Sequence, residues 1–302
     1  MAEPLVDRQF LEKLERLTLR WQKSFNGLVG GHNTSQFAGP GQEFLDHRNF
    51  HAGDDLRAVN WRAYMRFEKF FLKTFQVEPR VPVRLLLDAS TSMDVRTADV
   101  TAAAENLTKF DYARKLAAAL IYIGLVRLDS IVIQPFSARL LEPFFCSGGR
   151  HRFQPAESYL RTLKAEGRTN FHELARQYLS TYPQRGLTVI VSDFLDDGDC
   201  FHPLQYIADF GHELLLVQLW TEDDRQPRAR GELELIDAET GTRSTFLVDN
   251  DVTQRYTAAF EAYSEQLQKL ALRNGGRYVG LSTMSSLDEA LFGALTMSPA
   301  PN

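Results

Sequence analysis

From residue 81 onward, short apolar runs alternate with longer stretches in which apolar residues recur at helical spacing. The apolar runs predict buried strands at Val83–Asp88, Ile131–Phe136, Leu187–Asp193, Leu214–Leu219 and Arg277–Leu281. The amphipathic stretches predict helices at Phe110–Leu128, Ala156–Leu163, Phe171–Leu179, Pro203–Phe210 and Val252–Arg273. Ser286 with Glu289 predicts a capping box that opens a final short helix. Elements in this order predict an α/β fold, with a mainly parallel central sheet and helices on both of its faces.

One segment interrupts this rhythm before the last long helix. Two strand-like runs, Glu232–Ile236 and Ser244–Val248, flank the sequence Asp237-Ala238-Glu239-Thr240-Gly241. This pattern predicts an inserted β-hairpin near residues 232–248, with a glycine in its loop. The pattern is compatible with two roles for the hairpin, an edge that binds a partner or a lid on the end of the domain.

The first 80 residues follow a different pattern. Apolar residues spaced by three and four predict an N-terminal helix with Phe10, Leu14, Leu17, Trp21 and Phe25 on one face. A glycine-rich loop follows at 27–41, and we expect strands rather than long helices in the aromatic stretch 43–80. The chain therefore divides into an N-terminal helix with a β-rich extension, 1–80, and an α/β domain, 81–297.

The composition is that of an ordinary globular protein, with 44% hydrophobic and 24% charged residues among 302. The net charge of −5, without a dense Lys/Arg stripe, argues against a nucleic-acid partner. The sequence shows no signal-peptide pattern at its start and no apolar run near the roughly 20 residues that span a bilayer. Cys146 and Cys200 form no CxxC pair, so we expect free thiols in a reducing, cytoplasmic compartment.

Side-chain oxygens gather at the predicted carboxyl ends of two strands and before one helix. The first strand ends in Asp88, which Ser90 and Ser92 follow, and the third strand ends in Asp193. Asn170 with Glu173 at the N3 position predicts a helix N-cap, which leaves Thr169 just outside a helix N-terminus. Because ligands collect at the carboxyl ends of strands in open α/β sheets, we expect these oxygens to lie together. Two carboxylates and three hydroxyls, together with water, suit octahedral Mg²⁺, and the one position that water holds stays open to another ligand.

Such a site suits binding better than catalysis. Hydroxyl ligands leave the ion much of its positive charge, so the open position would accept an Asp or Glu of a protein partner. The nearest candidate base is His172, which we expect at the surface or the core edge. Two alternatives remain: a metal-free structural scaffold, and a haloacid-dehalogenase-like Mg-dependent phosphatase, which would need a second carboxylate where Ser90 stands.

At these residues the chain resembles the von Willebrand factor A fold, a Rossmann-like domain, and its metal-ion-dependent adhesion site. That motif reads Asp-x-Ser-x-Ser, then Thr, then Asp, and the matching residues are Asp88, Ser90, Ser92, Thr169 and Asp193. The resemblance implies that these five residues bind Mg²⁺, or Mn²⁺ or Ca²⁺. Two neighbouring positions differ from the usual pattern, since Arg168 and Phe194 stand where glycine is common.

The residues before the α/β domain are similar to the signature of a bacterial family, domain of unknown function 58. The similar residues are Gly41-Gln42-Glu43-Phe44, Arg48, Gly53-Asp54-Asp55-Leu56-Arg57, Asn60-Trp61-Arg62, Phe75 and Glu78. Asn60 stands where the family usually has Asp. The resemblance implies a MoxR-type AAA+ ATPase as partner, in chaperone-like maturation or metal insertion for a client protein. The chain has no GxxxxGK[ST] loop, so ATP hydrolysis would come from that partner.

Overall fold

A computed structural model describes residues 4–21, 38–39, 43–49, 59–67, 69–76, 82–96, 107–196 and 198–291. The chain forms two compact units, one of residues 30–80 and a larger one of residues 1–29 and 81–302. Helix α1 (Arg8–Trp21) belongs to the larger unit, because its Phe10 and Leu14 are buried in the hydrophobic core of that unit. This division differs from the sequence-based one, which grouped the N-terminal helix with the extension.

The core of the larger unit is a six-stranded sheet. Its strands are β4 (Val83–Asp88), β5 (Ile131–Phe136), β6 (Phe144–Cys146), β7 (Leu187–Ser192), β8 (Glu213–Trp220) and β11 (Arg277–Ser282). Their order is β11-β8-β7-β4-β5-β6, and only the edge strand β6 is antiparallel to its neighbour. The predicted mainly parallel α/β fold is confirmed. The sequence analysis did not predict β6, because three residues are too few to show the alternating pattern of a strand.

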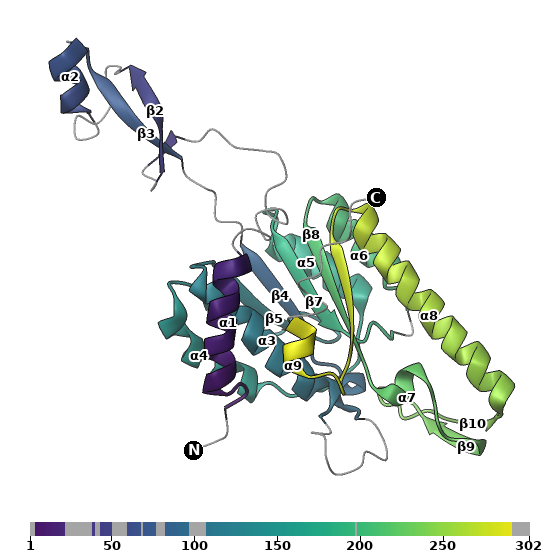
Figure 1. Cartoon of the computed structure of the whole chain (residues 1–302). Coiled ribbons are helices and arrows are strands. Elements are labelled where there is room, and N and C mark those ends of the chain that lie inside the picture. Colours follow the sequence, from purple (N-terminus) through teal and green to yellow (C-terminus); the bar gives the residue numbers. More distant parts are fainter. Residues whose placement is uncertain are drawn as a thin grey trace. The chain divides into compact units, whose positions relative to one another are not determined.

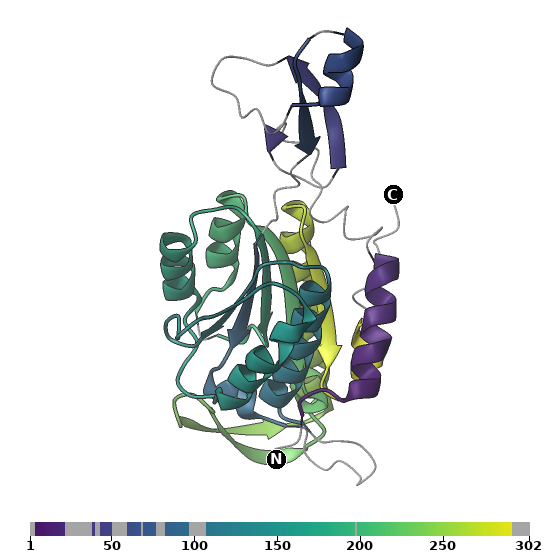
Figure 2. The same cartoon turned by 90° about the vertical axis from the view of Figure 1, so that its left-hand side faces the viewer.

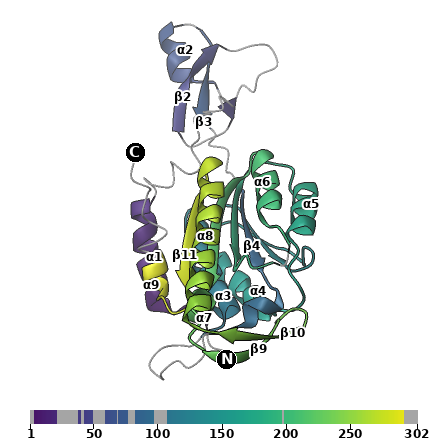
Figure 3. The same ribbon diagram turned by 90° about the vertical axis from the view of Figure 1, so that its right-hand side faces the viewer.

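Helices cover both faces of this sheet (Figures 1 and 3). Helices α3 (Lys109–Val126) and α4 (Phe153–Thr162) lie with α1 on one face, where they share a hydrophobic cluster with Leu85 and Leu87. Leu86, on the opposite side of β4, packs with helices on the other face. These helices are α5 (Phe171–Thr181), α6 (Phe201–Asp209) and α8 (Asn250–Arg273). The alternation along β4 follows from the two-residue period of a strand.

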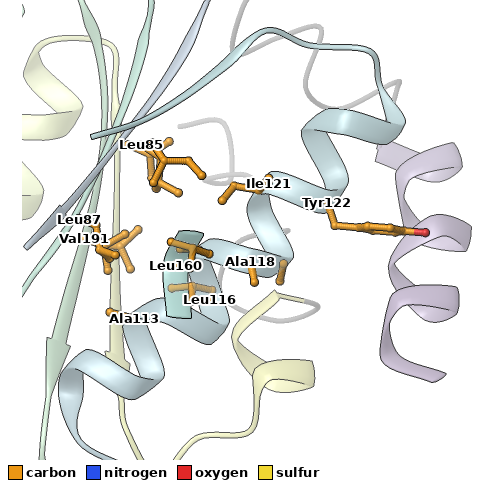
Figure 4. Close-up of a cluster of buried hydrophobic side chains, with 14 of the residues drawn as sticks. Leu85, Leu87, Ala113, Leu116, Ala118, Ile121, Tyr122, Leu160 and Val191 are labelled. Atoms are coloured by element: carbon orange, nitrogen blue, oxygen red, sulfur yellow. The ribbon is translucent and has the colours of Figure 1, made fainter. Parts of the chain in front are cut away.

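Helix α3 is buried on nearly all sides, since α1 and α4 cover the side that faces away from the sheet. Figure 4 shows its Leu116 and Ile121 among the strand residues Leu85, Leu87 and Val191, while Tyr122 points towards α1. Small alanines in α3 allow this close packing of layers. Among the described residues, no helix combines the length and the apolar character that crossing a membrane requires. Cys146 and Cys200 are free and buried.

The smaller unit contains the strands expected between residues 43 and 80. Strands β1 (Ala38–Gly39), β2 (Glu43–Asn49) and β3 (Phe71–Gln76) form an antiparallel sheet in the order β1-β3-β2, with a short helix α2 (Trp61–Phe67) before β3. The Tyr64 and Phe70 rings stack with centroids 4.5 Å apart. Parts of the family signature lie outside the described residues or side chains, namely Gly41-Gln42-Glu43-Phe44, Arg48, 53–57, Arg62, Phe75 and Glu78.

The predicted hairpin is present in the larger unit. It consists of β9 (Gly231–Ile236) and β10 (Arg243–Val248), which pair along their full lengths. Figures 1 and 2 show it at the end of the sheet where the parallel strands finish, beside α7 (Glu222–Arg225). The capping box expected at Ser286 and Glu289 opens α9 (Leu287–Glu289).

Candidate functional site

The five predicted site residues come from three loops at one rim of the central sheet. The sheet order reverses between β4 and β7, because β4 leads to β5 on one side whereas β7 leads to β8 on the other. Asp88 ends β4, and Asp193 directly follows β7. Such a switch point leaves a crevice outside the carboxyl ends of two neighbouring strands, which is where open α/β sheets bind ligands.

The first loop aims the oxygens of its serines towards one another. Asp88 is fully buried, and its Oδ1 accepts a hydrogen bond from the Ser90 backbone N–H at 2.9 Å. Ser90 occupies the N-cap position of a short 3-10 helix, Thr91–Asp94, yet its side chain makes no capping hydrogen bond. Instead, the Ser90 and Ser92 hydroxyl oxygens lie 3.0 Å apart. The two hydroxyls therefore hydrogen-bond to each other, and the Ser90 side chain does not cap the helix.

Backbone hydrogen bonds join this loop to the one that carries Thr169. The Thr91 N–H donates to the Gly167 carbonyl at 2.9 Å, and the Glu166 N–H donates to the Ala89 carbonyl at 2.7 Å. Gly167 has φ +90°, a conformation that a glycine adopts at little cost. Thr169 is buried as a result, with its Oγ1 3.5 Å from the Asp88 Oδ1.

The helix that follows is capped as predicted. Asn170 accepts a hydrogen bond from the Glu173 N–H at 2.9 Å, which starts α5 and leaves the Thr169 hydroxyl outside the helix. His172, on the first turn, is exposed. It therefore offers no buried base next to the cluster.

The third loop contributes Asp193 and a residue that the sequence analysis missed. The Ser192 hydroxyl donates to the Asp88 Oδ2 at 2.6 Å and so orients that carboxylate. Asp193 accepts from the Leu195 N–H at 3.1 Å through Oδ1, and from the Lys109 ammonium at 2.7 Å through Oδ2. Each Asp193 oxygen thus has one protein partner and retains a lone pair.

Lys109 places a permanent positive charge behind the site. Its ammonium lies 2.7 Å from the Asp193 Oδ2 and 3.2 Å from the Asp224 Oδ2, and its side chain is buried. Asp224 is held by a capping box with Thr221 at the start of α7. Nothing local in the sequence indicates this ion-paired cluster, because a lone lysine at the start of a helix is ordinarily exposed.

The electrostatics of the site show an excess of buried negative charge. Burial raises the pKa of Asp88 to about 7, the nearby charge of Asp193 acts in the same direction, and hydrogen bonds from Ser192 and Ser90 act against both. Burial also acts to lower the pKa of Lys109, but Asp193 and Asp224 outweigh it and hold that pKa above its ordinary value. The rim would therefore gain from a further cation.

One oxygen–oxygen distance at the rim equals the spacing of neighbouring Mg²⁺ ligands, and a second is slightly longer than the spacing for Ca²⁺. Adjacent ligands of an octahedral Mg²⁺ lie about 3.0 Å apart, and those of the larger Ca²⁺ about 3.4 Å apart. The Ser90–Ser92 oxygens are separated by 3.0 Å, and the Thr169 and Asp88 oxygens by 3.5 Å. Within the described part of the chain, no three His, Cys, Asp or Glu side chains are arranged to hold a metal by themselves. A metal here would depend on the hydroxyls.

A carboxylate from outside the three loops also reaches the cluster. Glu239, at the tip of the β9–β10 hairpin, lies 3.3 Å from the Thr169 N–H through each oxygen, and 3.3 Å from the Thr169 Oγ1 through Oε1. Burial raises the pKa of Glu239 above its ordinary value, and hydrogen bonds from Thr169 and Ser92 act against this shift. The sequence identified the hairpin but not this contact.

Phe194, which stands where glycine is common in the resembling motif, has a backbone φ of +57°. Its ring is fully buried and stacks on Phe171 with centroids 5.6 Å apart. We expect Phe194→Gly to relieve strain of about 1 kcal/mol but to lose about 3–5 kcal/mol of core packing. The net result is a destabilisation of about 2–4 kcal/mol, measurable by urea unfolding.

Phe194→Ala is the matched control, because alanine loses the ring and keeps the strain. It should be less stable than Phe194→Gly by about 1 kcal/mol. A glycine variant as stable as the original chain would show that the ring contributes nothing to the loop.

Comparisons with known proteins identify a family and several relatives of the chain. A family model described as "Protein of unknown function DUF58" matches residues 46–266. The chain is similar to the uncharacterized protein Rv1480 of Mycobacterium tuberculosis, with 24% identity over 286 residues that cover 92% of this chain and 86% of that protein. The uncharacterized protein Mb1516 of Mycobacterium bovis matches to the same extent.

Similar solved structures include the following two. One is BatB from Bacteroides thetaiotaomicron, at 14% identity and a TM-score of 0.41, covering 72% of this chain and 97% of that one. The other is the VWA domain of SpRpn10, at 11% identity and a TM-score of 0.38, covering 72% and 95% respectively. The strand order and register, rather than these scores, establish the fold described above.

Proposed function

We propose that this chain, which belongs to the DUF58 family of proteins of unknown function, is a non-enzymatic, divalent-metal-dependent protein-binding module. The proposal also rests on the three loops that gather oxygens at one rim of its sheet. The single observation that carries this proposal is the convergence of Asp88, Ser90, Ser92 and Thr169, whose oxygens have the spacing of neighbouring metal ligands.

The residues of the rim would have different roles in binding the cation. The Asp88 Oδ1 and the hydroxyls of Ser90, Ser92 and Thr169 would hold the cation, while the Ser192 hydroxyl fixes the other Asp88 oxygen. Asp193, whose oxygens already accept from Lys109 and Leu195, would add negative charge close to the ion. A bound Mg²⁺, Mn²⁺ or Ca²⁺ would supply the positive charge that attracts a partner's carboxylate.

The surroundings of Asp88 favour binding over phosphoryl transfer. A phosphatase of the haloacid-dehalogenase type would need a carboxylic acid two residues after its nucleophile, and that position holds Ser90. The buried cation near the site, Lys109, is paired with two carboxylates. Among the described residues, Asp88 accepts hydrogen bonds from Ser90, Thr169 and Ser192, which hold its carboxylate in place.

The partner would present an Asp or Glu side chain at a protein surface. The family resemblance makes a MoxR-type AAA+ ATPase the first partner to test, with the chain acting in chaperone-like maturation or assembly of a client protein. Nucleotide hydrolysis would then belong to the ATPase, and the metal rim would provide the contact.

A paired capture experiment tests this function. The original chain and Asp88→Asn are immobilised side by side and incubated with purified MoxR-type ATPase in Mg²⁺ without nucleotide. We expect the original chain to retain the ATPase until EDTA elutes it, and Asp88→Asn to retain none. Equal retention on both columns, unaffected by EDTA, would refute a metal-dependent contact.

A further inference from the structure

The tip of the β9–β10 hairpin carries an acidic side chain into the rim that the proposed function assigns to metal binding. Although the neighbouring tip residues are exposed, the Glu239 side chain is only 11% exposed. Both of its oxygens approach the Thr169 N–H, and the Ser92 hydroxyl also hydrogen-bonds to it. A carboxylate thus bridges two of the three loops that supply the metal ligands.

The turn is built to present this side chain. The Asp237 carboxylate accepts hydrogen bonds from the Glu239 N–H at 2.8 Å and the Thr240 N–H at 2.6 Å. Gly241, with φ +70°, closes the turn, and its N–H donates to the Asp237 carbonyl at 2.9 Å. These bonds hold the backbone of the tip, so that the position of Glu239 does not depend on a flexible loop.

The oxygens around Glu239 have the spacing of metal ligands. Its Oε1 lies 3.3 Å from the Thr169 Oγ1, between the separations expected for neighbouring ligands of Mg²⁺ and Ca²⁺, about 3.0 and 3.4 Å. The four oxygens that the proposed function assigns to the cation leave two of six octahedral positions, and an outside acid would take one of them. We propose that Glu239 is an internal acidic ligand that fills this position, so that a partner's carboxylate must displace the hairpin; this rests on the proposed function.

The hairpin is attached weakly enough to be displaced. Neither strand contributes to the two hydrophobic clusters of the larger unit, and large side chains on both strands are exposed, among them Ile236 and Leu247. Segments with few buried apolar contacts open at low free energy. When a partner's carboxylate replaces that of Glu239, the coordination of the metal changes little. Binding of the partner therefore has to offset only the free-energy cost of releasing the hairpin tip.

The charges near the tip agree with this assignment. Asp193 repels Glu239. The Nε of Arg168, whose side chain is half-exposed, lies 4.0 Å from the Glu239 Oε2. A screened contact of this kind contributes little. A cation between Glu239 and the serine hydroxyls would instead give the carboxylate a direct partner, which explains why an acid rather than a neutral residue occupies the tip.

Mn²⁺ bound to the full-length chain tests the proposal, since the relaxation of water protons reports how many exchanging waters the ion carries. We expect Glu239→Gln to bind Mn²⁺ about 10-fold more weakly and to show a larger relaxation enhancement, because water takes the vacated position. Sodium acetate should lower that enhancement in Glu239→Gln and leave the original chain unchanged. Glu234→Gln, on an exposed side chain of the same hairpin, should behave as the original chain does.

The outcomes separate the two proposals. If Glu239→Gln matches the original chain in affinity and relaxation while Asp88→Asn loses Mn²⁺, the metal site stands and the internal ligand is refuted. If acetate has no effect on Glu239→Gln, the vacated position does not take a carboxylate, and displacement by a partner is refuted. If the original chain binds no Mn²⁺, the proposed function fails and the role of Glu239 fails with it.

Discussion

Replacing Asp88 by asparagine is expected to weaken Mg²⁺ or Mn²⁺ binding by more than about 100-fold, because even groups that only support a metal ligand affect affinity by about 10–100-fold. At Mg²⁺ concentrations about 100 times its dissociation constant, the original chain should gain about 2.7 kcal/mol of stability from binding. Asp88→Asn should gain less than about 0.5 kcal/mol. Calorimetric titration measures the affinity, and thermal unfolding with and without Mg²⁺ measures the gain.

The variant should remain folded. An amide has nearly the size of the carboxylate, can still accept from the Ser90 N–H, and removes a buried negative charge that lies near Asp193. Asp209→Asn, at an exposed carboxylate at the end of α6, is the matched control and should bind Mg²⁺ as the original chain does. Undiminished binding by Asp88→Asn would show that the rim is not the metal site.

Replacing Lys109 by methionine is expected to destabilise the metal-free protein by about 3–5 kcal/mol, the usual cost of leaving a buried charge without its partner. Asp193 and Asp224 both lose the ammonium that lies 2.7 and 3.2 Å from them. Methionine fills much the same space, so the loss is electrostatic rather than a cavity. Urea unfolding measures the change.

Divalent ions should offset part of this loss. With Lys109 absent, the charge of Asp193 is less compensated, so Mg²⁺ should stabilise Lys109→Met more than it stabilises the original chain. Lys269→Met is the control, because that lysine is exposed and its pair with Glu265 at 3.2 Å should contribute less than about 1 kcal/mol. A Lys109→Met protein as stable as the control would mean that the buried pair is replaceable at no cost.

Much of the fold was predictable because its signals are local. The apolar runs that end at Asp88 and near Asp193 are strands, and the first begins and ends where the pattern placed it. The capping residues Asn170 and Ser286 also act as predicted, since a cap depends on neighbours within one turn. Strand β6 was not predicted, because it is too short to show a periodic pattern of its own.

The sequence by itself determined the succession of strands and helices, and the positions along the chain of the five oxygen-bearing residues, because periodicity and strand ends are local properties. Only the tertiary structure decided which distant groups meet them. Lys109 reaches Asp193 across 84 positions, and Glu239 reaches Thr169 across 70. Such contacts depend on how the layers pack and on where the hairpin folds back, and no short stretch of sequence encodes either.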